Sequence, residues 1–353
     1  MILVSDAELR HALAIIRSVG KIDEVVAQSE IPFATGFFSR FTKERIKEPL
    51  EKIDLSNFDV VYLVTDKAVA LGIRKKLKNA LLPKKRQFDT FRDKEKTVKL
   101  AEEIGVPVPE TVVIGRYENE FEYPVVVKPA VGSGSRGRVV LRGKEEAEKV
   151  LPELLKKYGK LLVQKVVKKR KTIGTEVIAV DGEIYGLFQH RRVREYPVTG
   201  GPSTLRISVR DERTRKLTEN LIEAVEYTGV AMAEFGIEKN GPVLFEVNPR
   251  WWGSLALAIK AGVDFPRIYY ELVKSGDSEK VLRYRVGVLC KFLLFGDILH
   301  FLAKRDLIGF LKSIPETGNF DILSLKDPLP ALARFLMAVH YLSKPELREY
   351  VLR

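Results

Sequence analysis

The stretch "PVLFEVNPRWWGS", residues 242–254, decides the fold of this chain. Its apolar residues predict a strand that ends in Glu246, Asn248 and Arg250, alternate positions that share one face of a pleated backbone. Pro249 restricts Asn248 to extended conformations, so the alternation continues to Arg250. A strand that only packs needs no carboxylate, amide and guanidinium in register. We therefore expect a functional site at this strand end.

A second strand that carries a carboxylate precedes this one, in "AMAEFGIEKNGPVLFEVNPR" (231–250). A three-residue loop at 239–241 would make a hairpin in which Glu234 faces Glu246 directly. Like charges in that position repel each other unless a cation lies between them. Two carboxylates and the Asn248 amide oxygen are ligands that suit Mg²⁺, with positions left for phosphate oxygens. A solvated sheet face with an Arg–Glu pair is the alternative interpretation.

Composition places the chain among globular proteins with anionic partners. Its 353 residues suggest two or three domains, and a net charge of +13 suits nucleotides, nucleic acid or an anionic membrane surface. The alternative is the charge-rich surface of a thermophile, in which lysine and glutamate dominate. The single cysteine, Cys290, excludes a disulfide and a cysteine metal cluster. The start "MILVSDAELR" reads as a strand entering a helix rather than a signal peptide, and no apolar run could span a bilayer, so we expect a cytoplasmic protein.

Strand and helix patterns divide the chain into three parts. Apolar residues 2–4 and 60–64 alternate with helical patterns, and a capping box of Ser5 and Glu8 predicts the start of a helix over 11–19. This rhythm predicts a small parallel α/β domain without the glycine pattern of dinucleotide sites. A longer α/β domain and then a mostly helical module are expected to follow. The three parts span 1–92, 93–275 and 276–353.

The middle part contains several short motifs in order. "DKEKT" (93–97) opens a helix, and "VVVKPAVGSGSRG" (125–137) is a strand that runs into a Gly/Ser loop. "VQKVV" (163–167) is another strand, and "GTEVIAVDGEIYGLFQHRRV" (174–193) predicts a hairpin that turns at Asp181-Gly182. Glycines in a loop let backbone N–H groups approach phosphate oxygens. The Gly-Lys-Ser/Thr ending of a Walker loop is absent.

Together with the Glu-x11-Glu-x-Asn-x-Arg pattern, these motifs resemble the ATP-grasp superfamily. The spacing from the first Glu to the Arg resembles that of biotin carboxylase and of the carbamoyl-phosphate synthetase large subunit. The resemblance covers residues 93–265 and rests on all of the motifs in this order, since each one alone is weak. It implies a mixed α/β fold in which two halves enclose a nucleotide cleft, after a small parallel α/β domain and before the helical module.

The resemblance implies which residues hold the nucleotide phosphates. Lys94 and Lys128 match two lysines that reach the phosphates, where a compact positive charge suits an anion. A mobile loop that folds over the triphosphate is matched here by Ser133, Gly134, Ser135 and Gly137. Arg136 and the length of this loop favour a lid over a plain hairpin turn.

The resemblance also implies a place for the adenosine. The backbone of Lys165 and Val167, in the hinge between the two halves of the cleft, is expected to pair with adenine. Relatives often have Glu in place of Gln164, whose amide oxygen could still accept from the adenine amino group. Glu176 matches the acidic residue that accepts hydrogen bonds from the ribose hydroxyls.

The metal ligands and the catalytic groups are implied in the same way. Glu234, Glu246 and Asn248 match the magnesium ligands of relatives. Arg250 matches the arginine beside the transferred phosphoryl group or the acceptor, and with Lys128 it is expected to be catalytic. The resemblance therefore implies ATP and Mg²⁺, with Mn²⁺ as an alternative ion.

An arginine-rich loop lies between the hinge and the carboxylate hairpin, in "QHRRVREYPVTGGPSTLRIS" (189–208). In proteins of this fold the region faces the acceptor, and guanidinium groups suit an anionic acceptor such as a carboxylate. The candidate acceptor-binding residues are Arg192, Arg194, Ser203 and Arg206. A surface loop with counter-ions is the alternative interpretation.

The reaction implied by the resemblance is ligation. A carboxylate attacks the γ-phosphate of ATP, and an amine or similar nucleophile then displaces phosphate from the acyl-phosphate. Small-molecule carboxylates and amines are the partners that this reaction needs. An ATP-dependent phosphotransferase with the same cleft is an alternative. A nucleic-acid-binding protein is a third, suggested by the charge of +13, but we do not expect nucleic acid because no aromatic-basic platform is present.

The C-terminal module contains no residues that the sequence connects to chemistry. It is basic and amphipathic, with apolar residues at helical spacing in "VLCKFLLFGDILHFLAK" (288–304). It could cap the active site, form a homodimer surface, or lie on a partner or a membrane. Plain packing against the other domains is the simplest expectation.

Overall fold

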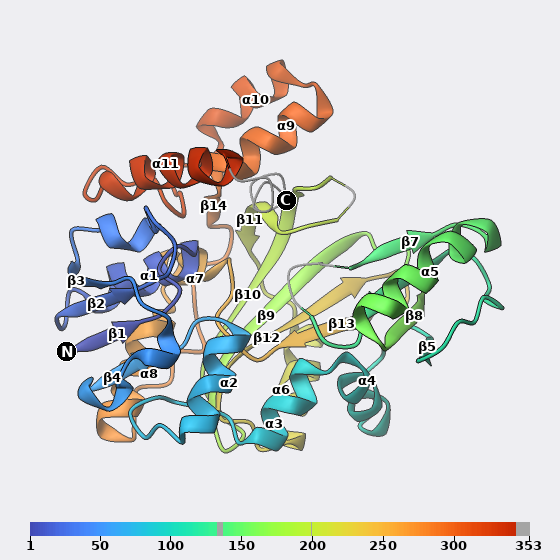
Figure 1. Ribbon diagram of the computed structural model, residues 1–353, viewed down its shortest axis with the longest axis horizontal. Helices are drawn as coiled ribbons and strands as arrows, with labels where there is room; N and C mark the ends of the chain where they lie inside the picture. The colour runs from blue at the N-terminus through green and yellow to red at the C-terminus, as the bar shows by residue number, and fades with distance from the viewer. Residues whose placement is uncertain (133–136, 199, 344–353) are drawn as a thin grey trace.

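The N-terminal part is built on a four-stranded parallel sheet (Figure 1). Its strands are β1 (Ile2–Val4), β2 (Val25–Gln28), β3 (Thr42–Ile46) and β4 (Val60–Tyr62). The order is β3-β2-β1-β4, and β1 pairs in parallel with both of its neighbours. The computed structural model describes residues 1–132, 137–198 and 200–343. The parallel sheet predicted from the sequence is confirmed.

Helix α1 (Arg10–Val19) begins without the capping box predicted at Ser5 and Glu8. Its N-cap residue makes no side-chain hydrogen bond to the helix. The Ser5 hydroxyl instead accepts from the Val64 N–H at 3.0 Å, and the Glu8 carboxylate accepts from the Ser29 hydroxyl at 2.6 Å. Both side chains therefore connect neighbouring strand ends of the sheet, and the capping prediction is wrong.

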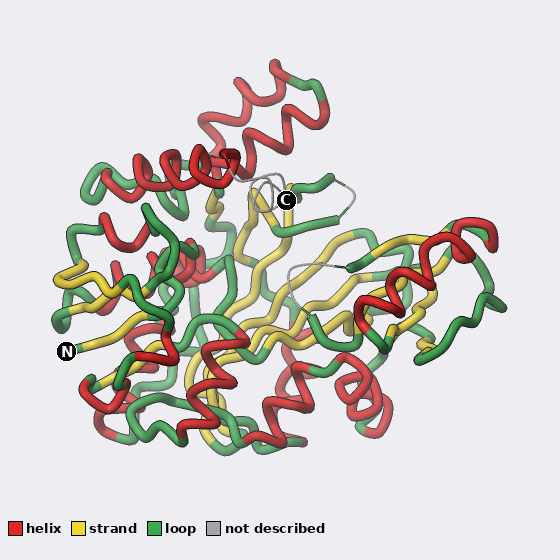
Figure 2. Tube along the Cα trace, in the orientation of Figure 1, coloured by secondary structure: helices red, strands yellow, loops and turns green. Residues whose placement is uncertain are grey.

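A six-stranded sheet forms the centre of the molecule (Figure 2). Its strands are β9 (Lys171–Val180), β10 (Glu183–Glu195), β11 (Ser203–Ser208), β12 (Gly229–Ile237), β13 (Pro242–Asn248) and β14 (Leu289–Lys291). The order is β13-β12-β9-β10-β11-β14, with antiparallel pairing throughout. The hairpin predicted at Asp181-Gly182 joins β9 to β10, and both turn residues have a positive φ, 44° and 87°, as a tight turn requires.

The β12–β13 hairpin brings Glu234 opposite Glu246, as its spacing predicts. The loop is not the expected three-residue turn, because Ile237 pairs with Pro242 and four residues lie between them. Phe245 is an extra residue in β13, and this bulge restores the register by the time the chain reaches the two glutamates. The bulge and the longer loop compensate for each other, so the two carboxylates face each other.

A smaller sheet with one covering helix forms a unit on one side of the molecule (Figure 1). Its elements are β5 (Thr111–Ile114), β6 (Val125–Pro129), β7 (Val139–Leu141), β8 (Leu161–Lys165) and α5 (Lys144–Tyr158). The strand order is β5-β8-β6-β7. Leu141, Ala147, Leu151 and Leu161 are buried in a core that belongs to this unit alone. The unit therefore has its own packing and does not depend on the core of the large sheet.

Helices cover both faces of the large sheet. They are α3 (Lys85–Arg92), α4 (Lys94–Glu103), α6 (Glu212–Ala224), α7 (Leu255–Ala261) and α8 (Phe265–Ser275). Helix α2 (Asp66–Lys75) packs instead against the N-terminal sheet. On one face, Leu221 and Ile222 of α6 pack against the sheet. On the other face, Trp251 and Trp252 are buried between the large sheet, α7, α8 and the N-terminal sheet. Burial of each such side chain stabilises the fold by roughly 2–3 kcal/mol, so this layer holds the two sheets together.

The C-terminal module returns to the N-terminal part. After β14 it contains α9 (Ile298–Lys304), α10 (Leu307–Ser313) and α11 (Leu329–Ser343), which agrees with the expected helical character. The buried carboxylate of Asp327 accepts from Arg17 Nε at 2.8 Å and from the Ser39 hydroxyl at 2.9 Å. Asp321 forms ion pairs with Arg10 and Arg206. Within the described residues, no helix has both the length and the apolar character needed to cross a membrane.

Candidate functional site

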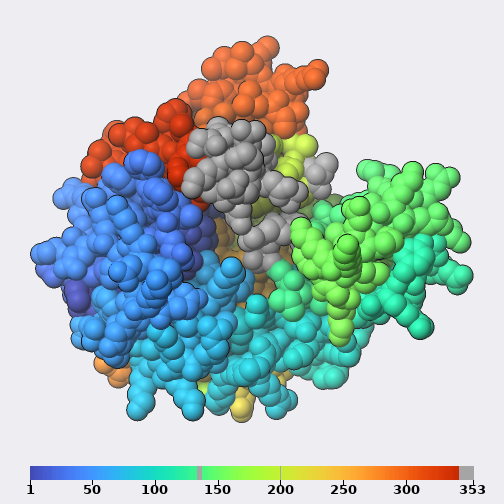
Figure 3. Space-filling model, viewed as in Figure 1, coloured from blue at the N-terminus to red at the C-terminus, as the bar shows by residue number. Residues whose placement is uncertain are grey.

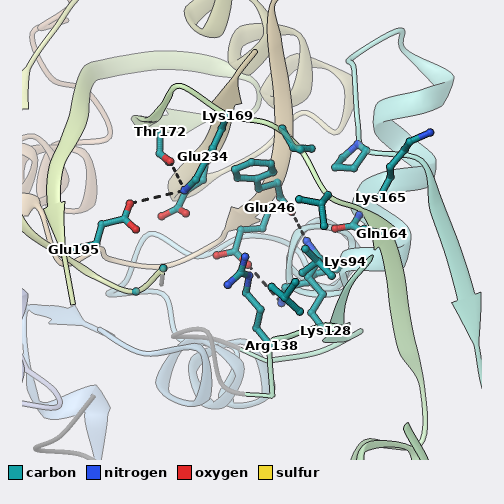
Figure 4. Close-up of a pocket in the computed structure, with 18 of the residues that line it drawn as sticks. Lys94, Lys128, Arg138, Gln164, Lys165, Lys169, Thr172, Glu195, Glu234 and Glu246 are labelled. Atoms are coloured by element: carbon teal, nitrogen blue, oxygen red, sulfur yellow. Dashed lines mark hydrogen bonds and ion pairs between the residues drawn. The ribbon is translucent and has the colours of Figure 1, made fainter. Parts of the chain in front are cut away.

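A cavity lies between the small sheet and the large sheet (Figure 4). Strands β6, β7 and β8 line one side, and β9, β10, β12 and β13 line the other. The charged residues that line it are Lys94, Lys128, Arg138, Lys165, Lys169, Arg192, Glu195, Glu234 and Glu246. Figure 3 shows the surface hollowed between the α5 unit and the rest of the molecule. Because cations outnumber carboxylates, the cavity suits an anionic ligand.

Glu246 lies among cations near the middle of this cavity (Figure 4). Its carboxylate is 3.7 Å from the Lys94 ammonium, which also donates to the Gly132 carbonyl at 2.7 Å. Burial alone would raise the pKa of Glu246, but the positive charges of Lys94 and Lys128 outweigh burial and hold the pKa below its usual value. Glu246 is therefore ionised at neutral pH and available as an oxygen ligand.

Lys128 reaches the cavity from the end of β6 and donates to the Phe245 carbonyl at 2.9 Å. Burial lowers the pKa of its ammonium group to about 8, and the attraction of Glu246 only partly offsets this effect. An anion that enters the cavity would stabilise the charged form of Lys128, because its negative charge would offset the loss of hydration that burial imposes on the ammonium group.

Glu234 lies across the hairpin from Glu246 and forms an ion pair with Arg192. Burial opposes the charge of Arg192, but Glu234 and Glu195 raise its pKa above the ordinary value. The Arg192 guanidinium also donates to the Gly201 carbonyl at 3.2 Å. Of the arginines predicted for the acceptor, Arg192 is therefore the one that the structure places in the cavity.

The residues present fit a hard cation. Glu234 and Glu246 face each other, and the Asn248 amide lies next to Glu246, donating to its carboxylate at 3.2 Å. Among the described residues there is no cluster of three or more His, Cys, Asp or Glu side chains that could hold a metal alone. Two carboxylates and an amide oxygen, with phosphate and water completing the shell, are a donor set that suits Mg²⁺.

The predicted hinge lines the far end of the cavity (Figure 4). Gln164, Lys165 and Val167 are all among the lining residues. The Gln164 side-chain NH₂ group donates to the Thr111 hydroxyl at 2.8 Å. The amide oxygen of the same side chain is a hydrogen-bond acceptor that a ligand could use. The Val167 carbonyl accepts from the Lys169 N–H at 2.9 Å. The hinge therefore lines the cavity, and its pairing with adenine stays a prediction.

The Gly/Ser loop, predicted to fold over the triphosphate, is described in part. Ser133, Gly134 and Ser135, together with Arg136, lie outside the described residues. Gly132 lines the cavity. Gly137 has a φ of 75°, and a Cβ there would come within 2.9 Å of the Tyr158 ring, so only glycine suits this position.

Arg250 leaves the strand in the direction of the N-terminal sheet. Its guanidinium is 3.3 Å from the Asp66 carboxylate and donates to the Asn248 amide oxygen at 3.1 Å. It is not among the cavity-lining residues, although Glu246, four positions earlier, is. The row Glu246, Asn248 and Arg250 therefore leads from the cavity to the N-terminal domain.

Arg194, Ser203 and Arg206, predicted to bind the acceptor, do not line the cavity. Irregular pairing of β10 around Arg194 breaks the alternation, so this residue turns away and forms ion pairs with Asp297 and Glu316. Arg206 is fully buried against Asp321. Ser203 is buried as well. Their positions correct the prediction, because Arg194 and Arg206 tie the C-terminal module to the large sheet, and Ser203 pairs with Glu195 of β10.

Glu176, predicted to bind ribose, is also elsewhere. Its side chain is fully buried on β9, accepts from the Ser254 hydroxyl and lies 3.0 Å from His190 Nδ1. The His190 ring lies over Gly174, where a Cβ would come within 2.5 Å of the ring. Glu176 belongs to this buried polar group, and it does not line the cavity.

Several cavity residues were not found by sequence reasoning. Arg138 follows the Gly/Ser loop, and its place after that loop was the available signal. Lys169 donates to Thr172 at 2.8 Å and lies 3.9 Å from Glu195 (Figure 4). Lys169 comes from a charge run that reads as a solvated loop, and Glu195 comes from the end of a long strand. Only the three-dimensional arrangement brings them together.

Comparison with known families decides the identity of the middle part, because residues 91–254 match the family described as "ATP-grasp domain". This part of the chain is an ATP-grasp domain. The match contains all of the cavity residues that carry a charge. The resemblance drawn from the sequence motifs is confirmed.

Two curated proteins are each similar to part of the chain. Pyruvate carboxylase of Bacillus subtilis is 28% identical over an alignment 188 residues long, which covers 48% of this chain and 16% of that protein. Phosphoribosylamine–glycine ligase of Thermococcus gammatolerans is 30% identical over an alignment 169 residues long, which covers 40% of this chain and 37% of that protein. The chain thus spans well under two thirds of these relatives.

The fold extends beyond the ATP-grasp domain. N5-carboxyaminoimidazole synthetase from Staphylococcus aureus, solved in complex with ADP, superimposes with a TM-score of 0.70 at 15% identity. The superposition covers 89% of this chain and 86% of that one. The order of N-terminal sheet, ATP-grasp domain and C-terminal segment is therefore a shared architecture, and the expected mixed α/β fold is confirmed.

Proposed function

We propose that the protein is a Mg²⁺-dependent ligase that uses ATP to join a carboxylate to an amine. One observation carries the proposal: Glu234 and Glu246 face each other beside Lys94 and Lys128, in a cavity of an ATP-grasp domain. The similarity to a phosphoribosylamine–glycine ligase and the fold shared with a synthetase that binds ADP support it.

In this proposal the nucleotide enters between the two sheets. Its adenine lies against Gln164, Lys165 and Val167, and its phosphates lie among Lys94, Lys128 and the Gly/Ser loop. The lowered pKa of Lys128 supports this placement, since an anionic phosphate would stabilise the ammonium form that burial destabilises. These lysines neutralise charge and position the γ-phosphate without forming covalent bonds.

The facing carboxylates are proposed to hold the metal. Magnesium bound by Glu234, Glu246 and Asn248 would offset the negative charge of the phosphates. Arg192 forms an ion pair with Glu234, so metal binding and Arg192 compete for the same carboxylate. Once released, the Arg192 guanidinium could bind an anionic acceptor as a planar fork.

The acceptor is proposed to lie between the cavity and the N-terminal domain. Arg250 is on this side, next to Asn248 and Asp66, where its charge could steady an anion. A carboxylate oxygen attacks the γ-phosphorus, and ADP leaves with the electrons of the broken P–O bond. The amine nitrogen then attacks the acyl carbon, phosphate leaves, and the nitrogen loses a proton. The boundaries 1–92, 93–275 and 276–353, a cytoplasmic location and a homodimer stay predictions beside this proposal.

The test is phosphate release from Mg-ATP with a panel of carboxylates, each with and without amines. We expect release that requires both an acid and an amine. A stable phosphorylated acceptor, formed without an amine, would show a phosphotransferase instead. Glu246→Gln should abolish turnover while the protein stays folded, whereas Glu238→Gln, at the end of the same hairpin and outside the cavity, should leave turnover unchanged. Turnover retained in Glu246→Gln would contradict the metal assignment.

A further inference from the structure

The C-terminal stretch 302–339 carries eleven of the 21 large apolar side chains that the described part of the chain exposes. The hairpin surface, as we call it, consists of Leu302, Leu307, Ile308, Leu311 and Ile314, which are between 50% and 71% exposed. Figure 1 shows the α9–α10 hairpin extending from the body of the molecule. An apolar patch of this kind on a monomer usually marks an interaction site.

The inner side of the hairpin accounts for its own folding. The rings of Phe301 and Phe310 pack edge to face at 5.9 Å, which joins α9 to α10. His300 Nδ1 lies 2.7 Å from the Glu195 carbonyl and attaches α9 to the end of β10. The hairpin surface takes no part in these contacts, so the fold does not explain its apolar character.

The charges around the hairpin surface are mainly positive. Lys304, Arg305 and Lys312 are exposed on the same two helices. The carboxylate of Asp306 is used as a helix cap and accepts from the Gly309 N–H at 2.7 Å. Aliphatic side chains flanked by lysine and arginine are the pattern of helices that lie in the surface of an anionic bilayer.

A second apolar row continues this pattern on α11. It consists of Leu329, Leu332, Leu336 and Val339, each three or four positions apart and exposed. Leu325, in the turn before the helix, is exposed as well. Figure 1 shows α11 and the hairpin on the same side of the molecule. Such spacing places the side chains along one stripe of a helix, which adds a second exposed apolar surface on this side of the molecule.

We propose that the hairpin surface docks on an anionic lipid bilayer. The chain carries +13, so a second copy would bring a like-charged rim against Lys304, Arg305 and Lys312. Protein interfaces depend on Trp, Tyr and Arg anchors, whereas the hairpin surface consists of leucine and isoleucine. Helices of seven residues are too short to span a bilayer and suit shallow insertion. This proposal does not depend on the proposed function.

The test is sedimentation of the full chain with vesicles of phosphatidylcholine, alone or with about one-third phosphatidylglycerol. We expect binding to the anionic vesicles that weakens as salt rises, and little binding to phosphatidylcholine alone. The double variant Leu307→Gln/Ile308→Gln should bind these vesicles at least about tenfold more weakly. The double variant Lys304→Gln/Lys312→Gln should bind about 25-fold more weakly, since each basic residue near the surface contributes about fivefold.

A matched control is Val112→Gln/Val113→Gln, which changes two exposed apolar residues of β5 in the small sheet. It should bind vesicles as the unchanged protein does. Equal sedimentation with both kinds of vesicle, or unchanged binding by Leu307→Gln/Ile308→Gln, would overturn the proposal. A dimer in light scattering that this variant dissociates, without any vesicle binding, would assign the hairpin surface to a second copy and would also overturn it.

Discussion

Replacing Lys128 with methionine should make the nucleotide-free protein more stable at neutral pH. Burial lowers the pKa of this lysine from 10.5 to about 8, so between these values the unfolded chain binds more protons than the folded one. Stability therefore rises with pH across this window, and below it the buried charge costs about 3 kcal/mol. The substitution also removes the hydrogen bond to the Phe245 carbonyl, which costs about 1 kcal/mol. The net gain in stability is therefore about 2 kcal/mol.

Urea unfolding without nucleotide, at pH 7 and again near pH 10, measures this effect. Lys128→Met should exceed the unchanged protein by about 2 kcal/mol at pH 7 and lose that advantage near pH 10, where the lysine is neutral in the folded state. Lys149→Met, at an exposed position of α5, is the matched control and should show no such pH dependence.

The reasoning would be refuted if Lys128→Met were less stable than the unchanged protein by the same amount at both pH values. That result would mean that packing and the hydrogen bond to Phe245 outweigh the cost of the buried charge. A confirmed gain would show that this lysine is kept at the expense of stability, as expected of a residue whose charge serves a ligand.

Three further perturbations follow from the structure. Burial raises the pKa of Glu8 to about 7, so the folded state binds more protons above pH 4.5 and stability falls as the pH rises toward 7. Glu8→Gln should therefore add about 2 kcal/mol at pH 8 and nothing at pH 4 in urea unfolding. Asp327→Ala leaves the largely buried Arg17 without its carboxylate and should cost about 3–5 kcal/mol in guanidinium unfolding, and a loss below about 1 kcal/mol would contradict the structure. Arg192→Met frees Glu234, so calorimetry without nucleotide should show Mn²⁺ bound about tenfold more tightly; unchanged affinity would mean that the two do not compete.

The sequence predicts those parts of the site that depend on strand periodicity. Glu234, Glu246 and Asn248 come together because a two-residue alternation and a hairpin place them on one face. Even here the agreement has two causes, since the bulge at Phe245 offsets a loop one residue longer than expected. The hydrophobic pattern of both strands fixes the final register more strongly than the turn does.

The failures concern residues whose partners are far away in the chain. The guanidinium group of Arg206 would suit an anionic acceptor, but its actual partner, Asp321, is 115 positions later in the chain. Arg194 is two positions after Arg192, so a regular strand would place both on one face. Irregular pairing instead turns Arg194 toward Asp297. Glu176 is engaged by a hydroxyl 78 positions later. Local sequence patterns do not indicate such long-range contacts. The burial of these residues and the irregular strand pairing beside them are therefore known only from the structure.

The return of the C-terminal module to the N-terminal sheet has a consequence for the order of folding. Arg10 and Arg17 are largely buried, and the carboxylates that neutralise them lie 311 and 310 residues further along the chain. A ribosome delivers the first sheet early and these carboxylates late. Until then, two arginines of α1 have no carboxylate from Asp321 or Asp327 beside them, which disfavours their burial. The first sheet to be synthesised should therefore be among the last parts to reach its final packing.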